Sequence, residues 1–582
     1  MEKYFDEYIR WKNFPGMEDN LLKELADIEG NDAEITERFY TELDFGTAGL
    51  RGILGAGTNR MNIYVVRRAT AGLAKYLCNT NNTDAANRGV AIAYDSRRYS
   101  GEFAREAACT LARYGIKCFL FDTLHSVPQL SFTVRELHCI AGIVITASHN
   151  PPEYNGYKVY WEHGGQVTPD QAAEILSCIR SVDYFEVSPM PYEEAAASKY
   201  IRLIGDEIDE IYYRKTMTLR LNPEIVNQHG GSVNIVYTPL HGSGYVPVTT
   251  VLKRMGISNL HVVEQQRLPD GNFPTVKAPN PEDPNAFTLA FELADKVKAN
   301  LVLATDPDSD RLGVAVRNAD GIFQVLTGNQ IGCLLINYII SMKAEQHCLE
   351  DDGFIVKSIV STKLADAICR KHNVEIRNVL TGFRFVAEQI DLSESSGKGK
   401  FLFGFEESYG FLAGGFAHDK DAICAAMLVA EAAVYYSAKA GGKTLIDVLD
   451  EIYRTYGFYL EKTKSYTLTG KQGIEKIANA MEQLKADPPS EFGDEKVVTY
   501  DNFNTGMRLE LATDISSPIG LPKSNVLMYC FASDSWIVVR PSGTEPKLKL
   551  YVGSSGCSRH EAEQKLERLL TAADKIISPL LN

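Results

Sequence analysis

The segment Thr146-Ala-Ser-His-Asn-Pro-Pro152 follows directly after the apolar run Ile140-Ala-Gly-Ile-Val-Ile145. A short β-rich run that ends at a Ser/Asn/Pro turn is typical of a buried strand that leads into a tight loop. Open α/β sheets bind ligands at the carboxyl ends of their strands, so we expect Ser148 at the mouth of a crevice, where it can carry a transferred group. A turn that only caps the strand explains this segment equally well. Lys158 follows a second expected turn, Asn155-Gly-Tyr157, which would bring its amine to the same mouth.

Length and composition indicate a globular chain of several domains. Its 582 residues suffice for about four domains, and 45% are hydrophobic and 23% charged. The net charge of −15 argues against nucleic acid or an anionic membrane as the main partner. The 11 cysteines form no CxxC pair and the charged amino terminus is unlike a signal peptide, so we expect reduced thiols and a cytoplasmic location. Glu431 interrupts the longest apolar stretch, residues 422–438, which we interpret as a buried helix rather than a membrane span.

An internal repeat of strand, helix and strand organises most of the chain. Each helix is expected to end at a residue that tolerates a left-handed conformation, namely Gly115, Gly256 or Asn373. Strand, helix of 10–15 residues and strand is the pattern of parallel α/β sheets. The expected strand, helix and strand are 89–94, 101–114 and 116–121 in the first copy, 233–237, 246–255 and 259–264 in the second, and 355–360, 363–372 and 374–376 in the third.

A further apolar strand and a polar loop follow each copy. The loops contain Ser148, then Asp306-Pro-Asp-Ser-Asp-Arg311, then Gly404-Phe-Glu-Glu-Ser408. The final residues differ, with short strands at 526–531 and 535–539 and a long helix at 560–577, which indicates an α+β module. We therefore predict three related α/β domains with mixed or parallel sheets and a C-terminal α+β domain, arranged around a central cleft. The expected bounds are 1–206, 207–318, 319–455 and 456–582.

The second loop has the composition of a metal site. Asp306, Asp308 and Asp310 alternate along what we expect to be extended chain, so that three carboxylates converge on one hard cation. Ligands that are all oxygen select Mg²⁺ or Ca²⁺. An EF-hand is excluded, because Arg311 and Arg317 stand where that loop needs Gly and Glu. A cationic side chain beside metal ligands suggests an anionic substrate.

The other two loops offer groups that bind sugars and phosphates. In the last loop, Arg540 can hold two phosphate oxygens as a fork, while hydroxyl and backbone groups add donors at Ser542, Gly543 and Thr544. In the third loop, Glu406, Glu407 and Ser408 suit sugar hydroxyls. A short Ser-Gly-Thr turn is common in proteins that bind no phosphate there. The composition of the last loop alone therefore does not decide whether it binds phosphate.

Several other site types are excluded by spacing. Gly442-Lys-Thr444 lacks the upstream glycine of a P-loop, and no GxGxxG fingerprint or GxSxG elbow is found. His149 adjoins Ser148 in the sequence, and we expect the two side chains to point apart and His149 to brace the loop. A hydrolase dyad is therefore not expected.

The four loops, in this order, resemble the α-D-phosphohexomutases, and the resemblance covers nearly the whole chain. Phe405 within the third loop and the extension before Phe45-Gly-Thr-Ala-Gly-Leu-Arg-Gly52 are similar to the phosphoglucomutase/phosphopentomutase-like branch. The resemblance implies four domains around a cleft, a phosphorylated serine, Mg²⁺ and a hexose bisphosphate, here glucose 1,6-bisphosphate, that primes the enzyme as an activator.

The resemblance also implies roles for individual residues. Many bacterial members have His two residues after the sugar-loop Ser, but Gly410 stands there, so we assign the second proton transfer to Lys420 in His418-Asp-Lys-Asp421. Arg384 stands where a lysine is frequent. The implied set is Ser148 as phosphoserine and metal ligand, Asp306, Asp308 and Asp310 as metal ligands, Arg51 and Arg311 beside the transferred phosphate, Lys158 as general acid/base, Thr381, Gly382 and Arg384 for sugar orientation, Glu406 and Ser408 for the sugar, and Arg540, Ser542, Gly543 and Thr544 for the distal phosphate.

We therefore expect an isomerase that interconverts glucose 1-phosphate and glucose 6-phosphate through phosphoserine and glucose 1,6-bisphosphate. The sequence leaves open mannose or pentose phosphates as substrates, a sugar-phosphate phosphatase, and a sugar-phosphate-binding protein without catalysis. A lysine that exchanges a proton near neutral pH needs a lowered pKa, and we expect nearby charge to lower that of Lys158. The expected partners are small sugar phosphates, with neither nucleic acid nor membrane, and the oligomeric state is open.

Overall fold

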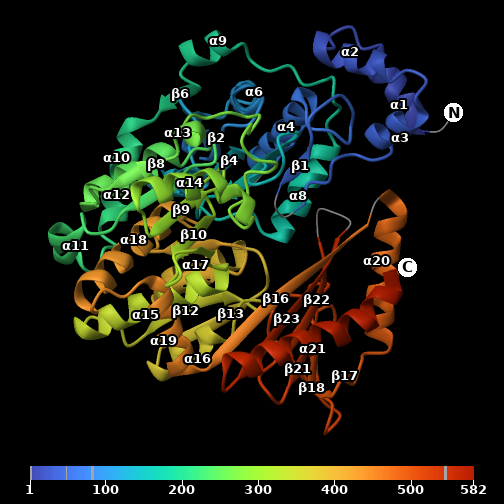
Figure 1. The fold of residues 1–582 in the computed structure, drawn as a ribbon. Helices are drawn as coiled ribbons and strands as arrows, with labels where there is room; N and C mark the ends of the chain where they lie inside the picture. Colours follow the sequence, from blue (N-terminus) through green and yellow to red (C-terminus); the bar gives the residue numbers. More distant parts are fainter. Residues whose placement is uncertain (1–2, 47–48, 80–83, 469, 543–546, 582) are drawn as a thin grey trace. The chain divides into compact units, whose positions relative to one another are not determined.

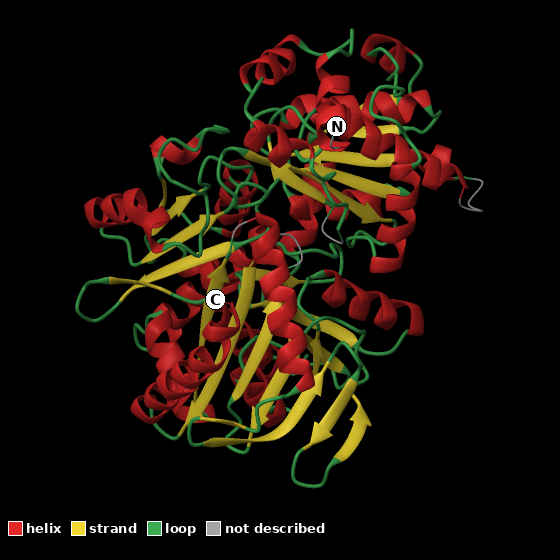
Figure 2. Cartoon of the chain, turned by 90° about the vertical axis from the view of Figure 1, so that its right-hand side faces the viewer, coloured by secondary structure: helices red, strands yellow, loops and turns green. Residues whose placement is uncertain are grey.

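The structure is a computed structural model that describes the chain except for residues 1–2, 47–48, 80–83, 469, 543–546 and 582. It divides into two compact units. The first consists of Met1–Thr327, Val386–Gly397 and Ser408–Thr444, and the second of Gly328–Phe385, Lys398–Glu407 and Leu445–Asn582. In both units, helices flank the strands of each sheet (Figure 2), as expected of α/β and α+β domains.

The first unit begins with three helices, α1 Lys3–Lys12, α2 Asp19–Asp27 and α3 Asp32–Phe39, and continues into a six-stranded sheet (Figure 1). The strand order is β1-β5-β4-β2-β3-β6, in which β1 and β5 are antiparallel to their neighbours and the other strands are parallel. The strands are β1 Leu50–Ile53, β2 Val90–Tyr94, β3 Cys118–Phe121, β4 Ala141–Ile145, β5 Tyr154–Trp161 and β6 Ile201–Ile204. The helices are α4 Ile63–Asn79, α5 Ala85–Arg88, α6 Ser100–Arg113, α7 Val127–Glu136, α8 Pro169–Arg180 and α9 Tyr192–Ala197.

A second sheet of the first unit has the order β11-β10-β9-β7-β8. Its strands β7, β8 and β9 are parallel, and β10 returns antiparallel to β9. The strands are β7 Ile235–Thr238, β8 Leu260–Val262, β9 Leu301–Thr305, β10 Leu312–Arg317 and β11 Phe323–Val325. The helices are α10 Asp206–Met217, α11 Pro223–His229, α12 Tyr245–Met255, α13 Glu264–Arg267, the 3₁₀ turn η1 Pro284–Phe287 and α14 Thr288–Val297.

The apolar helix α18 Ala422–Lys439 belongs to the first unit, where it contacts α11, α12 and strand β15 Gly410–Ala413. Within the described part of the chain it is the one helix long and apolar enough to cross a membrane, and 72% of that stretch is buried inside the protein. Its buried Glu431 accepts hydrogen bonds from the backbone N–H groups of Leu221 and Asn222, each at 2.9 Å. A carboxylate at the start of α11 also suits the positive end of that helix, which explains a charge in an apolar core helix.

The second unit holds a parallel β13-β12-β14 arrangement and a larger C-terminal sheet. The C-terminal strands run in the order β16-β23-β22-β21-β18-β19-β20, and α20 and α21 pack on them. The strands are β12 Gly353–Ser358, β13 Glu375–Val379, β14 Lys400–Glu406, β16 Phe458–Thr467, β17 Glu491–Phe492, β18 Glu495–Asn502, β19 Met507–Glu510, β20 Ile515–Pro518, β21 Leu527–Phe531, β22 Trp536–Pro541 and β23 Lys547–Gly556. The helices are α15 Gly328–Glu345, α16 Leu364–Lys371, α19 Leu445–Tyr456, α20 Gly470–Ala486, α21 Arg559–Ile577 and the 3₁₀ turn η2 Ser578–Leu581, while α17 Arg384–Ser396 begins in this unit and continues in the first.

The internal repeat is confirmed. In each copy the two strands pair in parallel, as β2 with β3, β7 with β8, and β12 with β13. The residues expected to end the three helices do have left-handed backbone, with φ of 73° at Gly115, 107° at Gly256 and 55° at Asn373. All 11 cysteines are free thiols, as expected.

Candidate active site

Ser148 lies in the loop between β4 and β5, immediately beyond the buried end of β4. It has a left-handed backbone, with φ of 52°, and its N–H donates to Thr146 Oγ1 at 2.8 Å. A non-glycine residue in this conformation costs free energy that the surrounding contacts must offset, and such residues concentrate at functional sites. The side chain is 3% exposed, and its hydroxyl donates to Asp306 Oδ2 at 2.7 Å. The loop therefore presents the serine oxygen to the aspartate loop.

The expectation that His149 points away from Ser148 is wrong. Ser148 Oγ lies 3.3 Å from His149 Nδ1, because the left-handed turn at Ser148 brings neighbouring side chains to one side, unlike an extended strand. Desolvation and the positive charges of Arg311 and Arg51 hold the pKa of His149 well below its usual value. The imidazole is therefore neutral at physiological pH and contributes a hydrogen bond rather than a charge.

The three aspartates lie in the turn between β9 and β10, where Thr305 pairs with Leu312. The chain there is a tight turn with Ser309 at φ 54°, so the expected extended conformation is wrong. The turn nevertheless brings one carboxylate oxygen each from Asp306, Asp308 and Asp310 within 4.8 Å of one another, and all three side chains are buried. The Asp306 carboxylate is fixed by the N–H groups of the two residues that follow Ser309, both at 3.1 Å.

Two oxygens of this triad suit a cation. Asp308 Oδ1 and Asp310 Oδ1 are buried and accept no hydrogen bond from any described residue. Buried oxygens without donors are unfavourable unless an ion binds them, and a set of carboxylate oxygens suits Mg²⁺. Burial and then the charges of Asp308 and Asp310 raise the pKa of Asp306 well above its usual value. Confinement of three carboxylates is thus costly, and a bound divalent cation would offset that cost.

Lys158 faces the same triad, but from a strand rather than from the expected turn. Residues 154–161 form β5, in which Lys158 pairs with Val144 of β4. Its buried ammonium lies 2.9 Å from Asp308 Oδ2 and 3.5 Å from Asp310 Oδ2. The expected lowering of its pKa is wrong in direction: burial alone would lower the pKa, but the two carboxylates together outweigh burial and raise it. The same lysine holds the pKa of Asp308 below its usual value, against the effect of burial.

Lys420 also reaches the triad. Its ammonium lies 3.1 Å from Asp310 Oδ2 and 3.2 Å from Asp419 Oδ1. The carboxylate of Asp419 is oriented by the hydroxyl of Tyr160, which donates to Oδ2 at 2.7 Å. A Cβ atom at Gly410 would lie 2.2 Å from Lys420 Cδ. The space beside residue 410 is therefore filled by the lysine stem, and the absence of a side chain at Gly410 is what lets Lys420 approach.

The two arginines expected beside a transferred phosphate have different partners. Arg51, on β1, donates to the side-chain oxygen of Asn150 at 3.3 Å, so it borders the serine loop. Arg311 follows the aspartate turn and forms an ion pair with Glu282, and the distance from its Nε to Asp310 Oδ1 is 3.9 Å. Both guanidinium groups belong to the surroundings of the serine and aspartate loops.

The sequence analysis missed Arg97 and Asp95, which shape the serine loop. The buried guanidinium of Arg97 donates to the carbonyls of Ser148 at 2.6 Å, Pro151 at 2.8 Å and Tyr154 at 3.1 Å, and also to that of Asn150. Asp95 accepts the hydroxyl of Thr146 at 2.6 Å. Asp95 is the first residue after β2, so the rule that polar residues at strand ends mark sites would have found it.

The remaining candidates lie in or beside the second unit. Gly382, at φ 119°, donates its N–H to Glu406 Oε1 at 2.7 Å, so the turn that begins at Thr381 and the glutamate are in contact. Glu406 is the last residue of β14, not part of a loop as expected, and Ser408 follows in the turn that belongs to the first unit. Arg384 is the first residue of α17, and Arg540 is within β22. The N–H of Ser542 donates to the Lys547 carbonyl at 2.7 Å. Gly543 and Thr544 lie outside the described residues.

Family models match most of the chain, from residue 42 to residue 570 with gaps. The four segments of the phosphoglucomutase/phosphomannomutase model match in order: alpha/beta/alpha domain I at residues 42–185, domain II at 211–321, domain III at 327–456, and the C-terminal domain at 530–570. The predicted class, three α/β domains and a C-terminal domain, is therefore confirmed. The exact domain bounds given above stay a prediction.

Individual proteins that are similar to this chain belong to the same family. The chain is 38% identical over 558 residues to a phosphoglucomutase of Staphylococcus aureus (strain MRSA252), which covers 95% of this chain and 96% of the relative. A phosphoglucomutase of Staphylococcus epidermidis (strain ATCC 35984) is also 38% identical, over 93% of this chain and 95% of its own. The structure of pp63/parafusin, a phosphoglucomutase from Paramecium, matches with a TM-score of 0.66 at 16% identity, over 92% of this chain and 96% of its own. A phosphoglucomutase/phosphomannomutase family protein from Burkholderia thailandensis matches with a TM-score of 0.62 at 18% identity, over 91% and 97% of the two chains. The two structures support the fold.

The contacts of Arg97 predict a positioning role. Arg97→Lys should loosen the serine loop, because one ammonium cannot replace a guanidinium fork that donates to several carbonyls. We expect amide hydrogen exchange of residues 146–154 to accelerate at least tenfold, with a smaller change elsewhere in the first unit. Arg113→Lys, at an exposed arginine that also donates to backbone carbonyls, is the control. Unchanged exchange in Arg97→Lys would show that the loop holds its shape without the guanidinium.

Proposed function

Because the chain belongs to the phosphoglucomutase/phosphomannomutase family, we propose that it is a phosphoglucomutase that interconverts glucose 1-phosphate and glucose 6-phosphate. The observation that carries the proposal is the 2.7 Å hydrogen bond from Ser148 Oγ to Asp306, because it sets a nucleophile against a buried carboxylate triad. The relatives that are 38% identical and named phosphoglucomutase favour glucose among the sugars that the sequence leaves open.

The metal assignment follows from the donor set. We propose that Asp306, Asp308 and Asp310, with an oxygen on Ser148, hold Mg²⁺. When bound, the ion would withdraw charge from the oxygens of the transferring phosphoryl group. The two buried oxygens that accept no hydrogen bond in the described chain are those expected to turn toward it. Lys158 and Lys420, both in contact with the triad, offset part of its negative charge, which favours an anionic substrate once the ion is bound.

The proposed reaction transfers one phosphoryl group twice. In the first half, the bond from phosphorus to Ser148 Oγ breaks and a bond from phosphorus to the free hydroxyl of the sugar monophosphate forms. Lys420, which must first lose a proton to solvent, accepts the hydroxyl proton as a neutral amine. Lys158 returns a proton to the serine oxygen, and its raised pKa keeps it protonated for that step. In the second half, the other phosphate of the bisphosphate returns to Ser148, both proton transfers reverse, and the isomer leaves.

The groups that would bind the rest of the substrate are proposed from the family motifs. Glu406 and Ser408 bind sugar hydroxyls, while the turn formed by Thr381, Gly382 and Arg384 distinguishes the two sugar orientations. The observed hydrogen bond from Gly382 to Glu406 supports this, because it couples the two elements. Arg540, Ser542, Gly543 and Thr544 hold the phosphate that is not reacting, and Arg51 and Arg311 border the one that is.

Glucose 1,6-bisphosphate is the proposed activator, since it can phosphorylate Ser148 and start the cycle. The proposed partners are small sugar phosphates and the proposed location is the cytoplasm. Turnover of glucose 1-phosphate, mannose 1-phosphate and ribose 1-phosphate, measured side by side with release of inorganic phosphate, tests the assignment. Glucose 1-phosphate should have the highest kcat/KM without phosphate release. Steady release of inorganic phosphate would identify a phosphatase instead.

Ser148→Ala should abolish mutase activity and leave the melting temperature within a few degrees of wild type, because one hydroxyl contributes little to the stability of so large a chain. Intact-protein mass should show one phosphate on the wild type after incubation with glucose 1,6-bisphosphate and none on the variant. Ser198→Ala, at an exposed serine, is the control and should behave as wild type. Turnover by Ser148→Ala would rule out the phosphoserine.

Removal of divalent metal with EDTA should inactivate the enzyme. Mg²⁺ should restore activity better than Ca²⁺, whose looser coordination positions phosphate oxygens poorly. Asp308→Asn should weaken this rescue at least tenfold, whereas Asp320→Asn, at an exposed aspartate in the turn after β10, should not. Turnover that chelation leaves intact would contradict the three-aspartate site.

The proton-transfer role of Lys420 can be tested through Gly410. Lys420→Ala should lower kcat about 10²-fold or more, the usual contribution of a general acid or base. Gly410→Ala should cost a similar factor, because the new methyl group occupies the space of the lysine stem. The double variant should be no worse than Lys420→Ala alone, since both changes act on one side chain. In Gly415→Ala, the nearest atom to the new methyl would be 3.5 Å away, and near-normal kcat is expected. Additive losses in the double variant would show that Gly410 acts independently of the lysine.

A further inference from the structure

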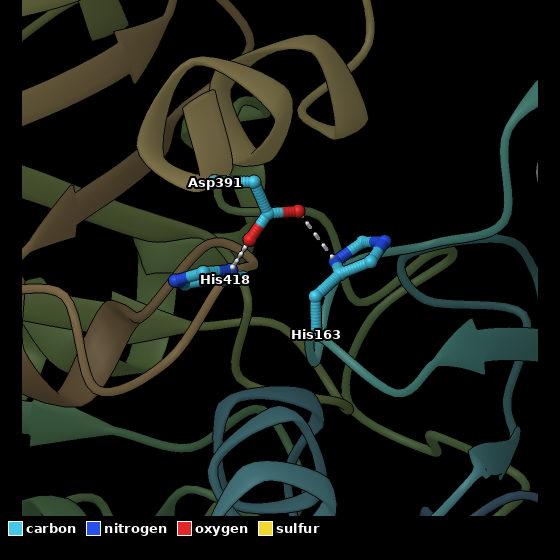
Figure 3. Close-up of side chains that lie close together, drawn as sticks. All are labelled: His163, Asp391 and His418. Atoms are coloured by element: carbon cyan, nitrogen blue, oxygen red, sulfur yellow. Dashed lines mark ion pairs between the residues drawn. The ribbon is translucent and has the colours of Figure 1, made fainter. Parts of the chain in front are cut away.

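A second group of potential metal ligands lies in the first unit, formed by His163, Asp391 and His418 (Figure 3). His163 is in the turn after β5, Asp391 is on α17, and His418 is in the segment that precedes α18. Asp391 lies between the two rings, with one carboxylate oxygen toward each: Oδ2 is 3.2 Å from His163 Nδ1, and Oδ1 is 3.2 Å from His418 Nδ1. One atom from each side chain lies within 4.8 Å of the other two.

The hydrogen bonds around this cluster show that neither imidazole supplies a proton to Asp391. The backbone N–H of Gly165 donates to His163 Nδ1 at 3.0 Å. The guanidinium of Arg135, which can only donate, lies 3.2 Å from His418 Nδ1. Both nitrogens that face the carboxylate are therefore acceptors. A carboxylate that faces two nitrogen lone pairs is electrostatically unfavourable, and the guanidinium of Arg135 offsets this beside His418. A metal ion held by all three side chains would take over that role.

The distances also match those that a metal ion imposes. A tetrahedral ion holds His nitrogen at about 2.0–2.1 Å and carboxylate oxygen at about 2.0–2.2 Å, so adjacent ligand atoms lie about 3.3–3.4 Å apart. The two nitrogen–oxygen distances of 3.2 Å are close to that edge. Two imidazoles and one carboxylate suit Zn²⁺ and related transition ions, in contrast to the oxygen-only triad, which suits Mg²⁺.

The surroundings give an ion access and leave a ligand position open. A surface hollow is lined by Arg135, His163, Glu388, Asp391, Leu392 and Glu394, so solvent reaches the cluster. His418 itself is 1% exposed, and its Nε2 lies 3.6 Å from Glu394 Oε1 without a hydrogen bond to any described residue. Among the described residues that line the hollow, Arg135 is the one permanent cation, and Glu394 accepts hydrogen bonds from its guanidinium at 3.0 and 3.1 Å. An ion bound by both Nδ1 atoms therefore replaces one hydrogen bond from Arg135 to His418 and one from the Gly165 N–H to His163.

We propose that His163, Asp391 and His418 bind a divalent transition-metal ion of the Zn²⁺ class, with water as the fourth ligand. The site joins β5, α17 and the segment before α18. His418 precedes Asp419, whose carboxylate holds Lys420 and Tyr160, so the bound ion fixes the backbone that positions these groups. The proposal does not depend on the proposed mutase activity, because its evidence lies outside the serine and aspartate loops.

Zn²⁺ binding to the full-length protein tests the site directly. The protein is stripped with a chelator and saturated with Mg²⁺ so that the aspartate triad does not compete. The exposed thiols of Cys78, Cys348 and Cys557 are alkylated so that they do not bind zinc. Calorimetric titration should give one Zn²⁺ per chain, and Co²⁺ should give the visible absorption of a tetrahedral ion. His163→Ala, Asp391→Ala and His418→Ala should each weaken binding at least tenfold, whereas His229→Ala, at an exposed histidine, should not.

Substitute variants, the melting temperature and an Arg135 variant test the same site independently. If His418→Ala does not fold, His163→Gln and Asp391→Asn, at partly exposed positions, carry the comparison, with circular dichroism to confirm the fold. Zn²⁺ should raise the melting temperature of the wild type but not of these variants. Arg135→Met should tighten Zn²⁺ binding at least threefold, because it removes a like charge beside the ion. No saturable binding to the wild type, or equal binding by wild type and all ligand variants, would overturn the proposal, as would weaker binding by Arg135→Met.

Discussion

The confinement of three carboxylates in one tight turn is the constraint on which the rest of the site depends. Asp306, Asp308 and Asp310 are buried together, and burial, followed by their mutual repulsion, raises the pKa of Asp306. The first unit offsets this with two lysines that come from elements far apart in the sequence, Lys158 on β5 and Lys420 before α18. The three carboxylates suit a cation, and the lysines that offset their repulsion suit an anionic substrate. The ion pairs that stabilise the buried aspartates thus also set the charge of the proposed active site.

The shape of the serine loop is fixed by a different set of contacts. Arg97 donates to several backbone carbonyls around Ser148, so the left-handed residue cannot relax without breaking bonds to a buried charge. Loop and turn follow the same plan, since each joins a strand to an antiparallel neighbour at the carboxyl end of a parallel strand. Because both sheets place a polar turn at the carboxyl end of a parallel strand, the Ser148 hydroxyl and the Asp306 carboxylate can lie within hydrogen-bond distance.

Much of this arrangement was predictable from sequence because it depends on local pattern. Apolar runs predicted the strands, and Gly115, Gly256 and Asn373 predicted the helix ends. The polar residues that follow two of these apolar runs identified Ser148 and the three aspartates as candidates. These features need only the periodicity of strands and the backbone freedom of particular residues. The four polar loops, in their order along the chain, then indicated the family, which the family comparison confirms.

The predictions that failed depend on local backbone conformation or on contacts between distant segments. The contact of His149 with Ser148 follows from a positive φ that no sequence pattern marks. The direction in which the pKa of Lys158 shifts depends on whether burial or two carboxylates have the larger effect. That balance is set by the distances from its ammonium to Asp308 and Asp310, which are 2.9 and 3.5 Å. Arg97 was missed because its partners are backbone carbonyls, which carry no sequence signal. The relation of Gly410 to Lys420 appears only when the space beside the glycine is measured.

The central claim is that Ser148 carries the phosphoryl group that the sugar receives, and an isotope chase tests it most directly. The protein is incubated with glucose 1,6-bisphosphate labelled in its phosphates, separated from free sugar, and chased with unlabelled glucose 1-phosphate. Before the chase, the label should lie on the peptide that contains Ser148. During the chase, it should pass into glucose phosphates at the rate of turnover. Label on any other residue, or its release as inorganic phosphate, would contradict the account.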